Sequence, residues 1–231
     1  MVTSSRPLWL VTGAAGALGA ELVRQLTATG VDCVALDNNE GGLNRLHDQM
    51  VEQGLPAPSL LPFDLAAAGP IHYEQVADRI AQQYGRLDGL IHNAAEFKAL
   101  RPMVHQPAEE WMRTLQAGVT APQLLNSALM SLLQSTADAM VVFISDKECL
   151  RHPANWAAYG AAQAARQWMV GTLKREVSAD QIEVLSIDPG AFYSSLRTAA
   201  WPVAQPSDFD PLERVAGRVL NLMKERRSND V

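Results

Sequence analysis

Two groups of residues in this chain have the types and spacing that chemistry requires. The first is a glycine-rich turn, Thr12-Gly13-Ala14-Ala15-Gly16-Ala17-Leu18-Gly19, between an apolar run and a helical pattern. Glycines let the backbone approach a pyrophosphate, and the N-terminus of the following helix attracts its negative charge. The turn therefore predicts a dinucleotide site. A tight turn that holds no ligand would have the same composition.

The second group surrounds Tyr159, whose phenol is a titratable group that can donate or accept a proton. Asp146 stands 13 residues before Tyr159, and Gln163 stands four residues after it. The pKa of a free phenol is about 10, so forming the phenolate at neutral pH costs roughly 4 kcal/mol. A cation about 4 Å away would supply roughly that amount at an effective dielectric constant near 20. Gln163 carries no charge, and an ionised Asp146 would raise the phenol's pKa further. Proton transfer is therefore expected to be weak.

Short apolar runs alternate with longer helical patterns, which predicts a parallel sheet with helices on both faces. Strands are expected at 8–12, 31–37, 59–64, 87–93, 139–145 and 182–188, and helices at 17–29, 42–53, 71–84, 108–133, 156–177 and 211–226. Residues 191–211 have no periodicity and are rich in Pro, Ser and aromatic residues. Such a long segment is typical of a lid over a binding site.

These motifs and their order resemble the short-chain dehydrogenase/reductase family over residues 7–226. The resemblance implies one α/β domain over residues 1–231, a three-layer Rossmann-like doubly wound parallel sheet of about six strands in the order 3-2-1-4-5-6. The usual seventh strand of the family is not expected. It also implies NAD(P)-dependent reduction of a carbonyl group or oxidation of an alcohol.

The resemblance assigns cofactor contacts to positions along the whole chain. Asp37 ends the second strand, where a carboxylate binds the adenosine ribose and repels a 2′-phosphate, so NAD(H) is favoured over NADP(H). Ala17 stands where classical members usually have their middle glycine. The expected cofactor-binding residues are Gly13, Ala15, Gly16, Leu18, Gly19, Asp37, Asp64, Leu65, Asn93, Pro189, Gly190 and Ser194.

The family's catalytic tetrad is degenerate in this sequence. Its serine position holds Asp146, its lysine position holds Gln163 and its asparagine position holds Gly118, so that Tyr159 alone matches. We therefore expect impaired or atypical catalysis. The alternatives are a non-catalytic protein that binds a dinucleotide or metabolite, and a structural subunit.

Three residues could rebuild the lost chemistry. Ser145 could supply the hydroxyl, although neighbouring residues at a strand end point to opposite faces. Lys147 could reach Tyr159, although its charged surroundings are typical of a solvated turn. Asp146 could itself act as an acid or base in a different reaction. His152 is expected at the surface, and packing is expected for the tryptophans at 156 and 168.

Composition limits the remaining possibilities. A net charge of −6 without a basic stripe argues against nucleic-acid binding, and no apolar run is long enough to cross a membrane. Cys33 and Cys149 form neither a disulfide framework nor a metal-ligand spacing, so no metal is expected and a reducing cytoplasm fits. The partner is expected to be a small molecule. Small residues over 157–165 would allow close helix packing, and the family resemblance implies a homodimer.

Overall fold

The computed structural model describes residues 6–180 and 182–228, so residues 1–5, 181 and 229–231 of the expected 1–231 domain lie outside the described residues. Within the described residues the sheet has six parallel strands in the order β3-β2-β1-β4-β5-β6, without a seventh, which confirms the predicted order. The strands are β1 (Leu8–Thr12), β2 (Asp32–Asp37), β3 (Ser59–Pro62), β4 (Gly89–His92), β5 (Met140–Ile144) and β6 (Glu183–Ile187).

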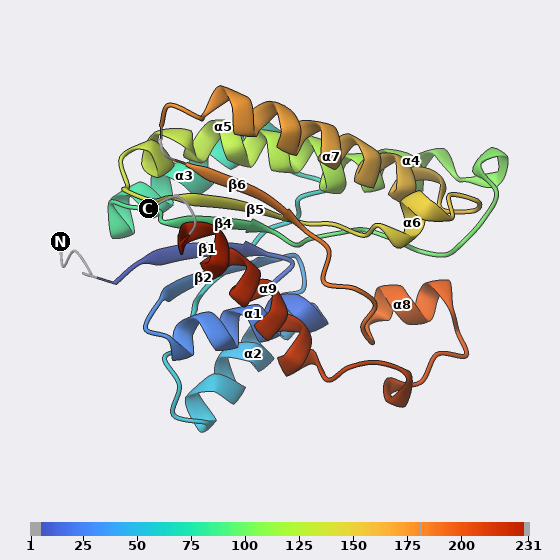
Figure 1. Cartoon of the computed structure of the whole chain (residues 1–231), viewed down its shortest axis with the longest axis horizontal. Coiled ribbons are helices and arrows are strands. Elements are labelled where there is room, and N and C mark those ends of the chain that lie inside the picture. The colour runs from blue at the N-terminus through green and yellow to red at the C-terminus, as the bar shows by residue number, and fades with distance from the viewer. Residues whose placement is uncertain (1–5, 181, 229–231) are drawn as a thin grey trace.

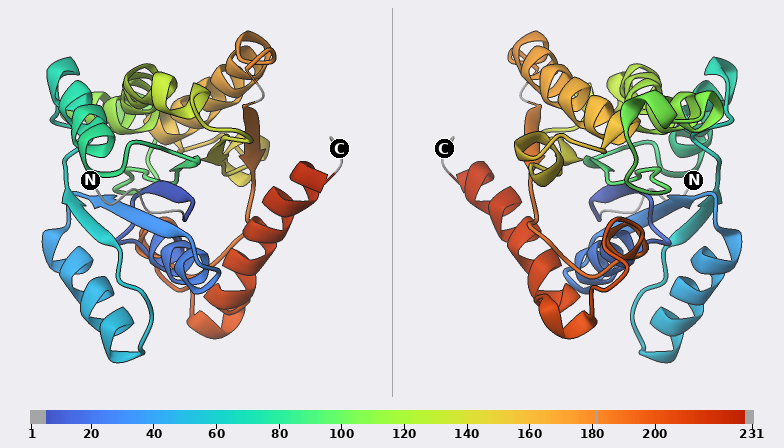
Figure 2. Two further views of the ribbon diagram at one scale, coloured as in Figure 1. Left: turned by 90° about the vertical axis from the view of Figure 1, so that its left-hand side faces the viewer. Right: turned by 90° about the vertical axis from the view of Figure 1, so that its right-hand side faces the viewer.

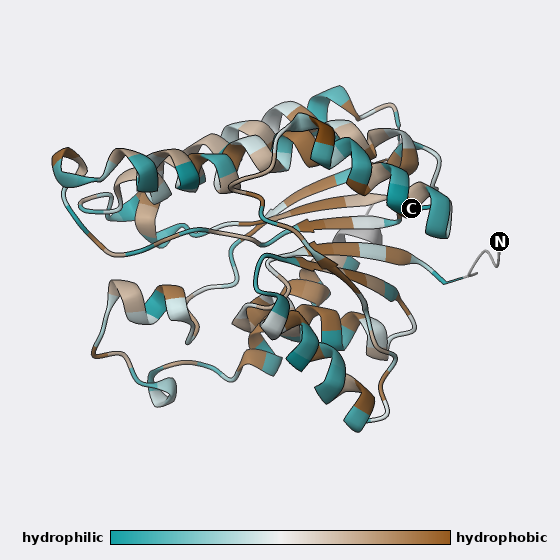
Figure 3. Ribbon diagram, turned by 180° about the vertical axis from the view of Figure 1, so that it is seen from behind, coloured by the Kyte–Doolittle hydropathy of each residue, from teal (hydrophilic) through white to brown (hydrophobic). Residues whose placement is uncertain are grey.

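Helices cover both faces of this sheet, which makes three layers (Figures 1 and 2). One layer contains α1 (Ala17–Ala28), α2 (Glu40–Glu52) and α9 (Leu212–Ser228); the other contains α3 (Pro70–Tyr84), α4 (Ala108–Leu115), α5 (Ala121–Gln134) and α7 (Ala157–Glu176). Successive strand residues serve opposite cores, as Leu10 packs with the second layer and Val11 with the first. The strands are therefore apolar on both faces (Figure 3).

The predicted helix over residues 108–133 is interrupted. A π-helical turn, η2 (Gln116–Thr120), separates α4 from α5. Pro122 has no backbone N–H, so it cannot donate to the carbonyl of Gly118 four residues earlier. That carbonyl is left available to a side chain from another helix. Such π-helical turns are frequent at functional sites.

The expected lid over residues 191–211 is more regular than its sequence indicates. It contains the short helix α8 (Ser195–Ala200) and the 3-10 turn η3 (Pro206–Asp208). Two other short elements escaped the sequence pattern, η1 (Met103–His105) and α6 (Glu148–Arg151). Trp201 at the end of α8 packs edge-on against Trp156, with ring centroids 5.5 Å apart. This contact connects the lid to the start of α7.

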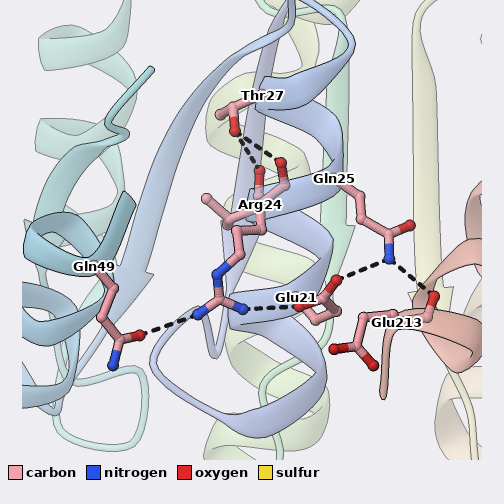
Figure 4. A network of polar contacts seen from close by, with 7 residues as sticks. Glu21, Arg24, Gln25, Thr27, Gln49 and Glu213 are labelled. Atoms are coloured by element: carbon pink, nitrogen blue, oxygen red, sulfur yellow. Dashed lines mark hydrogen bonds and ion pairs between the residues drawn. The ribbon is translucent and has the colours of Figure 1, made fainter. Parts of the chain in front are cut away.

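A polar network fixes α1, the helix that begins at the glycine turn (Figure 4). Arg24 donates to Glu21 at 2.8 Å and to Gln49 of α2 at 3.1 Å. Gln25 donates to Glu21 at 2.8 Å and to the backbone carbonyl of Glu213 in α9 at 2.9 Å. The network therefore holds α1 between its two neighbours.

No helix in the described part of the chain is long and apolar enough to span a lipid bilayer.

Candidate active site

A cleft of about 440 Å³ lies at the carboxyl ends of the strands and receives residues that follow all six of them. Ligands of open α/β sheets bind at this edge. The sequence-predicted residues that line the cleft are Gly13, Gly16, Leu18, Asp37, Asp64, Leu65, Asn93, Asp146, Tyr159, Gln163, Pro189, Gly190 and Ser194. Ala15, Gly19 and Gly118 are not among the lining residues.

Close backbone packing requires glycine at two positions of the turn. Gly13 has φ +67°, and a Cβ there would lie 2.8 Å from the Cα of Ala94. A side chain at Gly19 would overlap the carbonyl of Gly13. Gly16 is the N-cap of α1, which has no side-chain cap and no acidic residue in its first turn. The first N–H groups of α1 are therefore available to an anion, and Ala17 lines the cleft without closing it, so the residues fit a pyrophosphate.

Asp37 is held at one end of the cleft by backbone donors. Its Oδ2 accepts from the N–H of Ala15 at 3.0 Å, and its Oδ1 accepts from the N–H of Asn39 at 2.9 Å. Ala15 therefore orients the carboxylate instead of lining the cleft. Asp64 lies 3.5 Å from Arg113, which also donates to Glu96 at 2.9 Å.

Asn93 and Ser194 shape the cleft through bonds to the backbone. The side-chain amide of Asn93 donates to the carbonyls of Thr12 and Gly13 at 3.1 Å each, joining the glycine turn to the loop after β4. The hydroxyl of Ser194 accepts from the N–H of Arg197 at 3.1 Å and caps α8. Both side chains thus use part of their hydrogen-bonding capacity within the protein.

Tyr159, Asp146 and Gln163 converge on one hydrogen-bonded group. The Tyr159 hydroxyl donates to Asp146 Oδ2 at 3.3 Å, and Gln163 Oε1 accepts from the Asp146 N–H at 3.2 Å. Burial and then the charge of Asp146 raise the pKa of Tyr159 well above its ordinary value. The phenol is therefore protonated at neutral pH and directed at a carboxylate.

Gly118 stands apart from this group and serves packing. Its own Cβ would lie 2.9 Å from the Cβ of Ala162, so the absence of a side chain lets α7 approach η2. Its carbonyl accepts from Nε of Arg166 at 2.9 Å. An asparagine side chain has no room here unless α7 moves.

Arg166 is a buried cleft residue that the sequence analysis missed. Its guanidinium also donates to the carbonyl of Ile144 at 3.1 Å and to that of Ala94 at 2.9 Å. The residue is 2% exposed and lines the cleft. Burial lowers its pKa to about 10, which leaves it charged at neutral pH. Position 163 supplies no charge, as the sequence indicates, but Arg166 brings a buried cation to the same cleft. The sequence signal for Arg166 was its spacing from Tyr159, because it follows Tyr159 by seven residues and residues seven apart share a helix face.

Other candidates divide between the cleft and the surface. Ser145 and Asp146 follow the end of β5 at Ile144, and both residues line the cleft. Within the described residues, the buried Ser145 hydroxyl has no hydrogen-bond partner. Lys147 and His152 are exposed and do not line the cleft.

The two tryptophans of the 156–177 segment differ. Trp156 is buried and packs against Phe97 and Tyr159, with ring centroids 5.3 and 5.4 Å away. Trp168 is 79% exposed, so packing within the chain does not explain it.

Within residues 6–180 and 182–228, no cluster of three His, Cys, Asp or Glu side chains could hold a metal ion.

The strand order and the cleft at its carboxyl edge define a Rossmann-like protein with a nucleotide-type site. A family model described as short chain dehydrogenase matches residues 8–203, and the chain belongs to the short-chain dehydrogenase/reductase family. It is 32% identical over 197 residues to the uncharacterized oxidoreductase YciK of Escherichia coli. The aligned region covers 85% of this chain and 78% of that protein.

Solved structures of related proteins include dinucleotide complexes. A short chain dehydrogenase from Escherichia coli complexed with NADPH superposes with a TM-score of 0.88 at 30% identity, covering 94% of this chain and 90% of that chain. A short chain dehydrogenase from Shigella flexneri complexed with NADP superposes with a TM-score of 0.84 at 30% identity, covering 90% and 86%.

Proposed function

We propose that this chain is a nicotinamide-dinucleotide-dependent oxidoreductase with impaired proton transfer, acting slowly on a carbonyl or alcohol of a small molecule. The observation that carries the proposal is the bond from the Tyr159 hydroxyl to Asp146 at 3.3 Å, inside the cleft that the glycine turn also lines. The bound nicotinamide would supply or accept the hydride. Tyr159 would exchange the proton with the substrate oxygen.

The direction of proton transfer decides how strongly the site is impaired. In carbonyl reduction the phenol donates to a forming alkoxide, a strong base, so a protonated Tyr159 remains useful. In alcohol oxidation the phenolate must accept the proton, and burial together with the charge of Asp146 opposes that anion. We therefore expect weak reduction, with oxidation requiring alkaline pH.

The dinucleotide would extend along the cleft. Asp37 and Asp64 would hold the adenosine half, the first turn of α1 would hold the pyrophosphate, and residues 189–194 would hold the nicotinamide half. We propose that NAD(H) is preferred, because the carboxylate of Asp37 would repel a 2′-phosphate. The two structural relatives contain NADP or NADPH, so the preference needs a direct test.

Isothermal titration calorimetry with NADH and NADPH tests this proposal first. We expect NADH to bind more tightly, and Asp37→Asn to reduce the difference between the two. Failure to bind either would refute the proposal and favour a structural subunit.

Turnover on a panel of ketones, aldehydes and alcohols forms the second test. The variant Asp146→Ser with Gln163→Lys should gain about 10² to 10⁴ in rate, the usual worth of a positioned acid or base. A dinucleotide-binding protein that shows no turnover, even in this double variant, would be a non-catalytic binding protein.

We also propose a cytoplasmic homodimer formed by α4, α5 and α7. Trp168 on α7 is 79% exposed and Met112 on α4 is 62% exposed, and these two helices pack against each other. Burying both side chains against a second copy would remove apolar surface from water. Light scattering should give twice the chain mass, and Trp168→Glu should give a monomer. A tetramer that uses the β6 edge would contradict this arrangement.

A further inference from the structure

We infer that Arg166 is the positioning cation of this site: its buried guanidinium, two helical turns beyond Tyr159 on the same face of α7, stabilises the phenolate in place of a lysine at position 163. The inference rests on the proposed function, because it concerns the proton step of that reaction. Arg166 acts through Tyr159 and is assigned no contact with substrate.

The placement follows from helix geometry. Tyr159, Gln163 and Arg166 are spaced by four and then three residues, so they form one stripe on α7. Helical side chains lean toward the N-terminus of their helix, which directs Arg166 back toward the other two. All three residues line the same cleft and are buried.

Three carbonyls hold the guanidinium in this position. They belong to Gly118 in η2, to Ile144 at the end of β5 and to Ala94 after β4, at 2.9, 3.1 and 2.9 Å. The carbonyls come from three separate segments, so the planar fork of Arg166 has little freedom to rotate. A lysine ammonium lacks that fork and could not bridge the same three carbonyls equally well.

The charge of Arg166 lacks an ionic partner. Within residues 6–180 and 182–228, it forms no ion pair with a carboxylate. Burial lowers the pKa of His92 in β4 to about 3, and the charge of Arg166 lowers it as well. The imidazole of His92 is therefore neutral at neutral pH. A buried cation without a counter-charge favours an anion nearby, and the anion that α7 offers is the Tyr159 phenolate.

Other charged or titratable groups face the phenol from neighbouring segments. Asp146 after β5 and Cys149 of α6 both oppose the phenolate, whereas Arg166 favours it. Burial also raises the pKa of Cys149 to about 12, so this thiol is uncharged at neutral pH. Asp146 is therefore the one of these neighbours whose negative charge at neutral pH opposes Arg166. Removing that carboxylate exposes the effect of the guanidinium on the titration.

The test uses the full chain with Asp146→Asn as the background, and it requires neither dinucleotide nor substrate. The titration of Tyr159 is followed by NMR of ring-labelled tyrosine and assigned with Tyr159→Phe. Adding Arg166→Gln should raise the Tyr159 midpoint by at least about one pH unit, a tenfold change in the phenolate equilibrium. Arg166→Lys keeps the charge but loses the fork, so the Tyr159 midpoint should stay close to that of the Asp146→Asn background.

Comparing Arg166→Gln with Arg166→Lys separates an electrostatic effect of Arg166 from a purely structural one. Equal midpoints in the Gln and Lys variants, both shifted from the background, would assign Arg166 a structural role and overturn the inference. An unshifted midpoint in Arg166→Gln would also overturn it.

If Arg166→Gln does not fold, the Nε–H resonance of Arg166 in the Asp146→Asn protein carries the test. It should move with the same midpoint as the Tyr159 ring, and no movement across that midpoint would contradict the inference. Loss of dinucleotide binding or turnover in the unmodified chain would refute the proposed function alone, because none of these titrations depends on either.

Discussion

Replacing Asp146 with asparagine should release the proton of Tyr159 at a much lower pH. The substitution removes the charge while keeping an oxygen that can accept from the N–H of Glu148, as Asp146 Oδ1 does at 2.9 Å. The Tyr159 oxygen lies 3.3 Å from Asp146 Oδ2. Two negative charges at that separation would repel by about 5 kcal/mol at an effective dielectric constant of 20, an upper limit because the phenolate would move away. We therefore expect the pKa of Tyr159 to fall by roughly two to three units.

The assay is the same ring-labelled tyrosine titration, in unmodified protein and in Asp146→Asn. In the unmodified protein Tyr159 should not titrate before alkaline unfolding, whereas the variant should show a midpoint below that limit. Asp64→Asn is the matched control, because Asp64 lines the other end of the same cleft and pairs with Arg113. A Tyr159 that titrates in Asp146→Asn as it does in the control would refute the argument that this carboxylate retains the proton.

Two further predictions concern packing and buried charge. Gly118→Ala should lower the free energy of unfolding by about 1–3 kcal/mol, because the new Cβ meets that of Ala162. Denaturant titration should show a smaller loss in an Ala162→Gly background, and equal losses would exclude the clash. Burial lowers the pKa of His92 in the folded chain to about 3. As the pH falls below about 6.5, the imidazole becomes protonated in the unfolded chain but not in the folded chain, so the free energy of unfolding decreases. Between pH 6.5 and 5 the unmodified chain should lose about 2 kcal/mol more than His92→Gln in urea unfolding, and parallel losses would contradict the assignment.

The layered fold was predictable because its strands are apolar on both faces. The run over 139–145 predicts β5, which spans Met140–Ile144, and the run over 8–12 predicts β1 with the same bounds. Helix periodicity was less complete. It predicts one helix over 108–133, because the π-helical turn keeps the chain coiled and preserves the spacing of its apolar residues. The local signal for the break was Pro122, whose missing N–H frees a carbonyl.

The candidate site was predictable where it depends on local sequence and unpredictable where segments far apart meet. Asp37 and the glycine turn lie at the ends of their own strands, so their positions follow from the strand pattern. Spacing places Arg166 on the helix face of Tyr159, but it does not reveal the three carbonyls from other segments that hold the guanidinium. Ser145 was predicted inside the fifth strand, whereas β5 ends one residue before it.

Gly118 and Gln163, two positions where the family resemblance implies catalytic residues, are connected by one packing arrangement. Gly118 lacks a Cβ, which lets α7 approach η2 through Ala162, and the proline at 122 removes the N–H that would lie four residues after the Gly118 carbonyl. Arg166 satisfies that carbonyl and in doing so brings a buried charge beside the tyrosine stripe of α7. A lysine at position 163 would stand one turn from this guanidinium, and two like charges would repel in a buried site. Restoring the lysine beside an unchanged Arg166 should therefore cost stability, so the rate gain expected of the variant Asp146→Ser with Gln163→Lys should be accompanied by a lower free energy of unfolding.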